Sequence, residues 1–266
     1  MSNPAETYES FMVPALFGPW ASHLIGRANL RPGERVLDIA CGTGVVARKV
    51  APLVGLSGAV SAIDLSPHML AVAIAAAEQE SLDITWSEGQ AEALPYPDAS
   101  FDLALCQFAL MFFTDRSAAL KEMHRVLGPS GRVLLSVFQA IEHHPFYVAL
   151  DKAIGRRLGS SGVGDIFAIG DESEVSGLLA AAGFQQVTIA SESMIACFPN
   201  PEGFLAGEID VDTASIPAMQ QLGDSERRDL IAAVSDDMSA PLREFTRDGQ
   251  VAIPFHVYIA SAMMAV

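Results

Sequence analysis

Two acidic residues and a run of small residues lie close together in the first quarter of this sequence. The apolar segment Val36–Ile39 leads into Ala40-Cys41-Gly42-Thr43-Gly44, and Asp64 follows twenty residues after Gly44. Glycines let a backbone approach a ligand closely, and an acid that ends the next strand can accept hydrogen bonds from ribose hydroxyls. The spacing therefore predicts a binding site for a cofactor that contains a nucleoside.

These residues leave two classes of cofactor open. Gly42, Gly44 and Ala47 satisfy the G-x-G-x-x-G/A pattern of dinucleotide sites, which is weak evidence when it stands alone. Asp38 lies four residues before Gly42, where a buried anion would repel a pyrophosphate at the helix N-terminus. A cofactor with a cationic sulfonium and an amino-acid tail tolerates that carboxylate. We favour such a cofactor and keep an NAD(P)-dependent oxidoreductase as the alternative.

On these residues the chain resembles the class I S-adenosylmethionine (SAM)-dependent methyltransferases, in particular the UbiE-like enzymes that act on small molecules. The first motif of that family reads D/E-x-G-x-G-x-G. This chain has Asp38, Gly42 and Gly44, with Ala40 in place of the first glycine. That replacement weakens the resemblance little, because alanine adds only one methyl group where the turn begins.

Three further segments extend the resemblance from about Arg31 to Phe138. Residues 62–70 resemble the family's second motif, 89–102 its adenine-side loop, and 125–132 its turn before the fifth strand. Gln90 stands where an aspartate is usual, so its amide can still hydrogen-bond adenine but carries no charge.

The resemblance implies that the chain binds SAM, releases S-adenosyl-L-homocysteine, and methylates an O, N or C atom of a small molecule. A non-enzymatic SAM-binding regulatory protein is a further alternative. Gln107 and Phe108 are expected to lie beside the transferred methyl group and to position it; no general base is identified. The residues expected to bind the cofactor are Tyr8, Asp38, Ala40, Cys41, Gly42, Thr43, Gly44, Asp64, Leu65, Met69, Gln90, Ala91, Glu92 and Gln107.

Two other groups of residues could do chemistry, but ordinary roles explain them. His143 and His144 are adjacent, so on a helix they face different directions and cannot chelate together. The acidic residues Glu208, Asp210 and Asp212 have no neighbouring histidine to complete a metal site. We predict a polar helix start for the first group, a solvated acidic loop for the second, and no metal.

Composition bounds the class of protein. Half of the 266 residues are apolar, enough for a sizeable core, and the net charge of −16 argues against binding nucleic acid. Three cysteines without paired spacing suit a reducing compartment, and the polar N-terminus lacks the basic start and apolar run of a signal peptide. We therefore expect a cytoplasmic protein that binds neither nucleic acid nor membranes. The oligomeric state cannot be inferred from the sequence.

Strand and helix patterns alternate along the first half of the chain, which predicts a parallel sheet covered on both faces. The predicted strands are Arg35–Ile39, Ala59–Ile63, Ile84–Glu88, Leu103–Cys106 and Arg132–Val137. The predicted helices are Val13–Ala28, Gly44–Leu53, Ser66–Glu80, a short one at Ala91–Leu94, and Arg116–Leu127. With the resemblance, this implies an α/β, Rossmann-like doubly wound sheet that is mostly parallel and has an antiparallel C-terminal strand.

After Phe138 the alternation stops, and helical cap insertions are predicted. The predicted division is an N-terminal helical arm (1–30), a SAM-binding core (31–138), a cap insertion (139–170), a continuation of the core (171–198), a helical cap insertion (199–249) and a final core strand (250–266). We expect the cap segments to form a lid that selects the methyl acceptor, with a pocket wall formed by Phe146, Phe167, Phe198, Phe204 and Leu205.

Overall fold

The computed structural model describes residues 3–159, 162–215, 219 and 221–265. The chain forms two compact units, which we call the helical unit and the α/β unit. The helical unit comprises Met1–Leu16, Phe138–Gly170 and Ser193–His256. The α/β unit comprises Phe17–Val137, Asp171–Glu192 and Val257–Val266. The predicted division into a core and caps stays a prediction.

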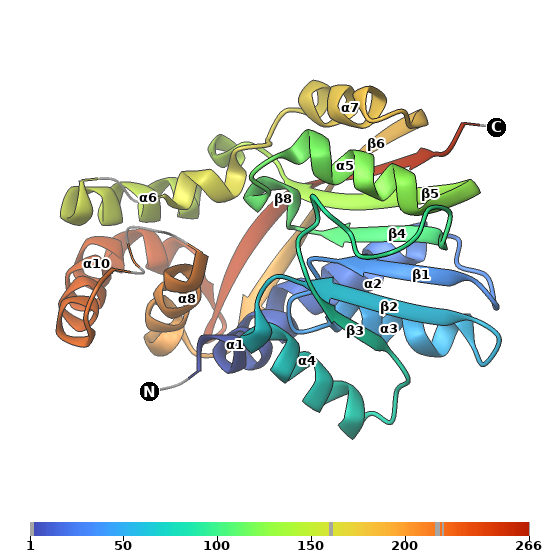
Figure 1. Cartoon of the computed structure of the whole chain (residues 1–266). Coiled ribbons are helices and arrows are strands. Elements are labelled where there is room, and N and C mark those ends of the chain that lie inside the picture. Colours follow the sequence, from blue (N-terminus) through green and yellow to red (C-terminus); the bar gives the residue numbers. More distant parts are fainter. Residues whose placement is uncertain (1–2, 160–161, 216–218, 220, 266) are drawn as a thin grey trace. The chain divides into compact units, whose positions relative to one another are not determined.

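Five parallel strands form the centre of the α/β unit in the order β3-β2-β1-β4-β5 (Figure 1). They are β1 (Arg35–Ile39), β2 (Ala59–Asp64), β3 (Thr85–Glu88), β4 (Phe101–Gln107) and β5 (Leu127–Phe138). Each neighbouring pair is parallel. The order reverses between β1 and β4, so the carboxyl ends of these two strands flank the crevice where open α/β sheets bind ligands.

The last two long strands, β6 (Gln185–Phe198) and β8 (Gln250–Met263), extend the sheet beyond β5. Gln139 N donates to His256 O, and Met264 N donates to Gly131 O. Residue numbers therefore rise on one strand as they fall on the other, so β8 runs antiparallel to β5. The predicted fold class, a mostly parallel Rossmann-like sheet with an antiparallel C-terminal strand, is confirmed.

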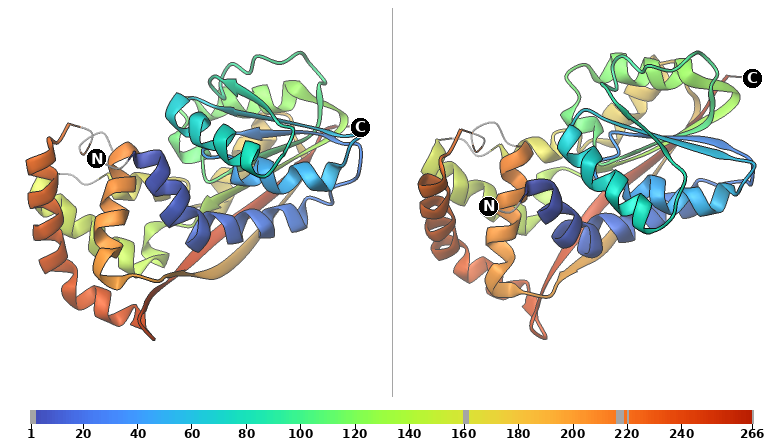
Figure 2. Two further views of the ribbon diagram at one scale, coloured as in Figure 1. Left: turned by 90° about the horizontal axis from the view of Figure 1, so that it is seen from below. Right: turned by 60° about the horizontal axis from the view of Figure 1, so that its bottom comes forward.

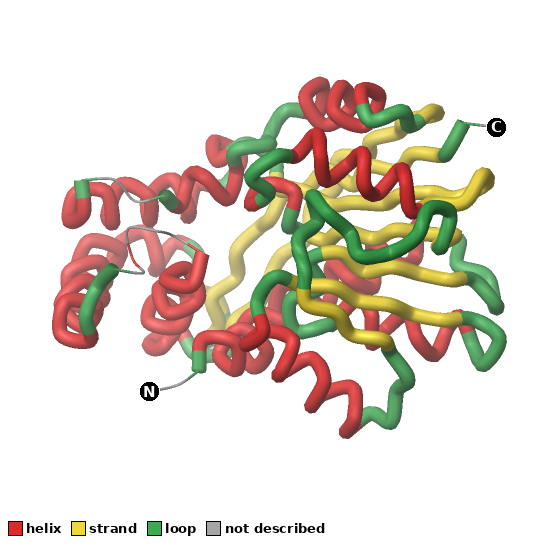
Figure 3. Tube along the Cα trace, viewed as in Figure 1, coloured by secondary structure: helices red, strands yellow, loops and turns green. Residues whose placement is uncertain are grey.

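Helices cover both faces of this sheet (Figure 3). They are α2 (Gly18–Arg27), α3 (Val45–Val54), α4 (Pro67–Gln79), α5 (Arg116–Val126) and α7 (Glu172–Ala181). Local capping sets where they begin: Ser66 Oγ accepts from Met69 N at 3.3 Å, and Asp115 Oδ1 accepts from Ala118 N at 2.9 Å. The predicted helix at Ala91–Leu94 is wrong, because these residues form turns.

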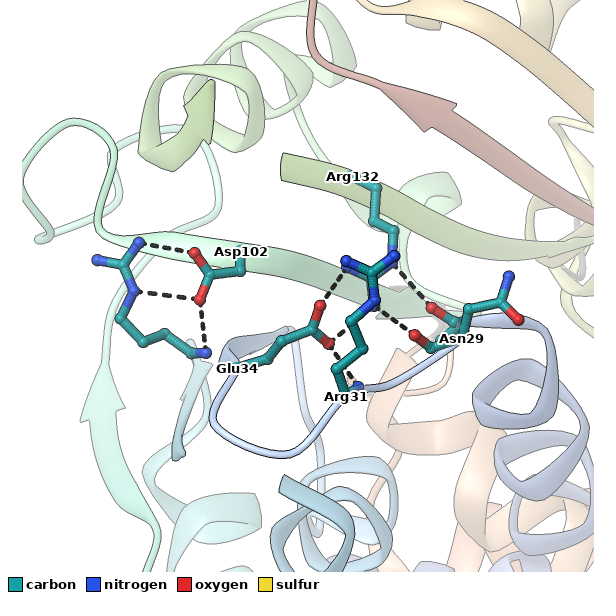
Figure 4. A network of polar contacts seen from close by, with 7 residues as sticks. Asn29, Arg31, Glu34, Asp102 and Arg132 are labelled. Atoms are coloured by element: carbon teal, nitrogen blue, oxygen red, sulfur yellow. Dashed lines mark hydrogen bonds and ion pairs between the residues drawn. The ribbon is translucent and has the colours of Figure 1, made fainter. Parts of the chain in front are cut away.

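Charged residues fasten the amino end of the sheet (Figure 4). Arg132 on β5 donates to both oxygens of Glu34, at 2.8 and 2.9 Å, and to the backbone oxygen of Ala28. Arg35 forms a second bidentate pair with Asp102. These pairs hold the connection between α2 and β1 at the end of the sheet away from the crevice, so they are structural.

The helical unit packs α6 (Pro145–Leu158), α8 (Pro201–Ser215) and α10 (Asp224–Glu244) together, and α1 (Pro4–Thr7) against α8 (Figure 2). Between α1 and α2 the chain is a π-helix, η1 (Tyr8–Phe17). The predicted helix Val13–Ala28 is two elements in the structure, because its first residues belong to η1 and α2 begins at Gly18. Within the predicted N-terminal arm, helical structure begins at Pro4, where Asn3 Oδ1 accepts from Ala5 N at 3.1 Å.

An aromatic core fills the helical unit. Phe198 and Phe204 have ring centroids 4.8 Å apart, and Phe146 lies 5.5 Å from Phe204. These rings, Phe167 and Leu205 are all buried. They pack on one another as a core does; the predicted lid function stays a prediction.

Two predictions about polar residues in this unit need correction or refinement. Glu208 is not in a solvated loop: it lies on α8 and is only 2% exposed. His144 caps α6 and is buried, with Nδ1 facing Ala140 O at 3.2 Å and Nε2 accepting from His256 N at 3.0 Å. Both ring nitrogens are therefore occupied. The side chain of Asp212 lies outside the described residues.

Candidate cofactor site

The turn after β1 has an unusual backbone. Ala40, Gly42 and Gly44 have φ angles of 54°, 55° and 78°, all in the left-handed region. Glycine adopts this region without penalty, whereas an alanine there is strained. The energetic cost of Ala40 in place of the family's first glycine therefore comes from its backbone conformation and not from the size of one methyl group.

Asp64 ties the end of β2 to this turn. Its Oδ2 accepts from Gly42 N at 2.7 Å and its Oδ1 from Ser66 N at 2.8 Å. Burial raises the pKa of Asp64, and these backbone bonds oppose that rise. Each carboxylate oxygen has a second lone pair, so Asp64 can hold the turn and still accept hydrogen bonds from a ligand.

Asp38 is directed at the first turn of α3. Its Oδ2 accepts from Ala47 N at 3.0 Å, and the residue is 1% exposed. Burial raises its pKa to about 8, although the bond from Ala47 lowers it, and the Asp64 charge raises it further. Asp38 is therefore not a permanent anion, so charge repulsion of a pyrophosphate does not explain why a dinucleotide is disfavoured here. Asp38 instead occupies a helix N-terminal N–H that a pyrophosphate would use.

A pocket of about 370 Å³ opens at the carboxyl ends of β1, β2 and β3. Predicted cofactor residues line it: Ala40, Leu65, Gln90, Ala91 and Glu92. The other lining residues are Ile63, Gly89, Phe112, Phe113, Thr114 and Asp115. The volume falls within the roughly 300–1,000 Å³ that is usual for small-ligand sites.

Two apolar side chains on the pocket wall are unusually exposed. Leu65 is 61% exposed and Phe112 is 49% exposed. Such side chains beside a polar loop can cover the faces of a flat ring. Sequence reasoning missed residues 112–115. The signal available was the Phe112–Phe113 pair two residues before Asp115, which caps α5.

The loop after β3 is held by α5, not by a helix of its own. Glu92 Oε1 accepts from Thr114 N at 2.9 Å, which joins the two walls of the pocket. Farther along, Leu94 N donates to Glu122, and Arg125 donates to the backbone oxygens of Leu94 and Tyr96. Glu92 thus stabilises the pocket by binding the Thr114 backbone. Its predicted contact with the cofactor stays a prediction.

Gln107 and Phe108 end β4 in a constrained arrangement. Gln107 Nε2 donates to Phe17 O at 3.2 Å, and Oε1 is buried without a hydrogen-bond partner among the described residues. Phe108 has a φ of 51°, rare for an aromatic residue, and its N donates to Ser136 O at 3.0 Å. Strained residues of this kind cluster at functional sites. The side-chain oxygen Oε1 of Gln107 therefore has hydrogen-bonding capacity left for a ligand.

The remaining predicted residues contribute in other ways. Cys41 is buried, and burial raises the pKa of its thiol. Thr43 is buried beside it with Oγ1 lacking a partner in the described structure. Met69 lies on α4 and is not a pocket-lining residue. Tyr8 lies on η1 in the other unit, so its role over the cofactor stays a prediction.

The packing around Gly44 leaves no room for a side chain. A Cβ on Gly44 would lie 2.5 Å from Cη2 of Trp86 and 3.2 Å from Cβ of Ala73. The indole of Trp86 occupies that space, so the close approach is between parts of the protein itself.

Comparison with known proteins agrees with this geometry. Residues 36–131 match the family model of the methyltransferase domain. The ubiquinone/menaquinone biosynthesis C-methyltransferase UbiE of Shewanella sp. (strain W3-18-1) is 38% identical over 126 residues, which are 47% of this chain and 50% of the relative. Residues 36–131 are therefore similar to a methyltransferase domain. It spans about half the length of the curated relatives that it matches.

Solved structures extend the likeness of the methyltransferase fold over most of the chain. A SAM-dependent methyltransferase from Aquifex aeolicus superimposes with a TM-score of 0.57 at 16% identity, covering 100% of both chains. The [4+2]-cyclase SpnF superimposes with a TM-score of 0.58 at 21% identity, covering 94% of this chain and 81% of the cyclase. At these identities the likeness concerns the fold alone, and the second structure shows that this fold also serves other chemistry.

The comparisons lend no support to the alternatives of an NAD(P)-dependent oxidoreductase or a non-enzymatic SAM-binding protein. Among the described residues, no group of three or more histidine, cysteine or acidic side chains is placed to hold a metal ion. Within the same residues, none of the helices has both the length and the apolarity needed to cross a membrane.

Proposed function

We propose that this protein transfers a methyl group from SAM to an O, N or C atom of a small molecule. The observation that carries the proposal is the convergence of five predicted cofactor residues on one pocket beside Asp64. In this proposal Asp64 holds the ribose, Leu65 and Phe112 cover the adenine, and the strained turn at 40–44 lies along the methionine part. SAM, when bound, supplies a methyl group on a cationic sulfur that is a good leaving group.

The chain's own contribution is alignment and exclusion of water, which can supply much of the rate of an in-line displacement. We assign Gln107 and Phe108 to positioning, because they end β4 at the crevice and their backbone is fixed by Ser136. The likeness to UbiE covers only 126 residues, which in this proposal include the cofactor site. It therefore does not identify the methyl acceptor of this chain. A cytoplasmic location is part of the proposal, supported by three cysteines without paired spacing.

Asp64→Ala tests the proposal. Loss of a carboxylate that accepts from ribose hydroxyls should weaken SAM binding by roughly ten- to a hundred-fold, since such charge-assisted bonds contribute about 1.5–3 kcal/mol. Titration calorimetry with SAM and with NAD measures this directly. Glu88→Ala is the matched control, because Glu88 is the exposed register partner of Asp64 on β3 and does not line the pocket.

Wild-type affinity in a folded Asp64→Ala protein would refute the cofactor assignment. Tighter binding of NAD than of SAM would refute it as well. Incorporation of labelled methyl from SAM into a mixture of small metabolites would then identify the acceptor.

A further inference from the structure

One buried acidic side chain in the helical unit lacks a complete set of hydrogen-bond partners. Glu208, on α8, is 2% exposed, and its Oε1 accepts from the Tyr147 hydroxyl at 2.7 Å. Its Oε2 is also buried and has no hydrogen-bond partner among the described residues. An unsatisfied polar atom in a protein interior costs free energy and calls for an explanation, often an unseen ion, water or ligand.

Aromatic rings pack around Tyr147, whose hydroxyl binds this carboxyl group. Phe204 precedes Glu208 by four residues on α8, so both side chains lie on one face of the helix. Across from them, α6 contributes Phe146, 5.5 Å from Phe204, and Tyr147, 5.5 Å from Phe146 between ring centroids. Phe11 of η1 lies 5.9 Å from Phe204. All of these residues belong to the helical unit.

This combination has a definite chemical preference. The faces of aromatic rings attract cations, and a desolvated carboxylate does so more strongly. The free oxygen needs a hydrogen-bond donor, which a protonated amine supplies and a carboxylate or phosphate does not. A neutral alcohol could donate one hydrogen bond but would leave the negative charge unbalanced. The site therefore favours a small alkylated ammonium group over neutral or anionic groups.

We propose that Glu208, Tyr147 and the surrounding rings form a binding site in the helical unit for a small protonated amine. Glu208 and Tyr147 are both buried, so the amine enters when the helices open locally, and it must be compact. The amine's N–H donates to Oε2 while the Tyr147 hydroxyl continues to donate to Oε1. No bond is made or broken. The proposal does not depend on methyl transfer by the other unit.

A pair of probes with the same heavy-atom skeleton tests the preference for charge. N,N-dimethylethanolamine is a cation at neutral pH, and 3-methylbutan-1-ol is its uncharged counterpart. Titration calorimetry on the full chain should show at least tenfold tighter binding of the amine, a difference of about 1.4 kcal/mol. Equal affinity for the two probes, or binding of neither, would overturn the proposal without any variant being needed.

Variants then locate the site. Glu208→Gln keeps the shape of the side chain but removes its charge, and should weaken amine binding at least tenfold. Glu202→Gln is the matched control, because Glu202 is an exposed acid on the same helix. SAM affinity should be unchanged in both variants, so failure of this proposal and failure of the proposed methyltransferase function remain distinguishable. Unchanged amine affinity in Glu208→Gln would show that the amine binds elsewhere and would refute the assignment.

Discussion

Asp38 in the α/β unit and Glu208 in the helical unit are both buried acids, yet their hydrogen-bond partners differ. Asp38 accepts from Ala47 N at the start of α3, so the fold itself uses its carboxyl group. Glu208 is bonded by Tyr147 on one oxygen only. Burial raises the pKa of both, to about 8 and about 7 respectively. The contrast indicates that the first acid stabilises architecture and the second is retained for a ligand.

The largest expected effect comes from removing Asp38, whose carboxyl group accepts a hydrogen bond at the start of α3. Asp38→Ala leaves Ala47 N without its acceptor and uncaps α3. We expect the α/β unit to lose about 4 kcal/mol of its unfolding free energy at about pH 5, where Asp38 carries its proton. Both tryptophans, Trp20 and Trp86, lie in this unit, so fluorescence during urea unfolding reports on it selectively.

Asp38→Asn is the control for this measurement. Its side-chain oxygen can still accept from Ala47, so it should retain most of the stability. If Asp38→Ala unfolds at the same urea concentration as the wild type, Asp38 is not an architectural acid and the contrast with Glu208 disappears.

A second, smaller effect should appear in the pH dependence of the helical unit. The folded pKa of Glu208, about 7, exceeds its ordinary value of 4.5, so folding favours the protonated form. The stabilisation is complete below about pH 4.5 and is lost as the pH rises through about 7, up to about 3 kcal/mol in total. Glu208→Gln should flatten this part of the profile.

Hydrogen exchange of peptides from α8, corrected for the intrinsic pH dependence of exchange, measures the effect between about pH 5 and about pH 8. The same profile in wild type and Glu208→Gln would mean that Glu208 is charged in the folded state without cost. Its missing partner would then already be supplied by the protein.

The smallest expected effect concerns the strained turn. Ala40 has a φ of 54°, and Ala40→Gly removes that strain while adding flexibility to the unfolded chain. The balance should stabilise the α/β unit by about 0.5–1 kcal/mol. Urea unfolding followed by tryptophan fluorescence measures it. A destabilised Ala40→Gly protein would show that the methyl group's packing outweighs its backbone strain.

Sequence reasoning located most of the α/β unit because its signals are local. The five strands, the start of α4 at Ser66 and the turn at 40–44 each depend on residues within a few positions of one another. It placed a helix at Ala91–Leu94 because it could not foresee that Glu122 and Arg125, about thirty residues later, bind that segment's backbone. The pocket wall at 112–115 was missed for the same reason.

The sequence by itself determined the class of fold and the cofactor-binding motif, because hydrophobic periodicity and backbone-specific residues act over short distances. Only the tertiary structure decided the states of Asp38 and Glu208. A carboxyl group's solvation and partners come from elements distant in sequence: β1 and α3 enclose the first, α6 and α8 the second. From the sequence alone, an acid in an acidic segment is predicted to be solvated, and only tertiary packing shows that it is buried.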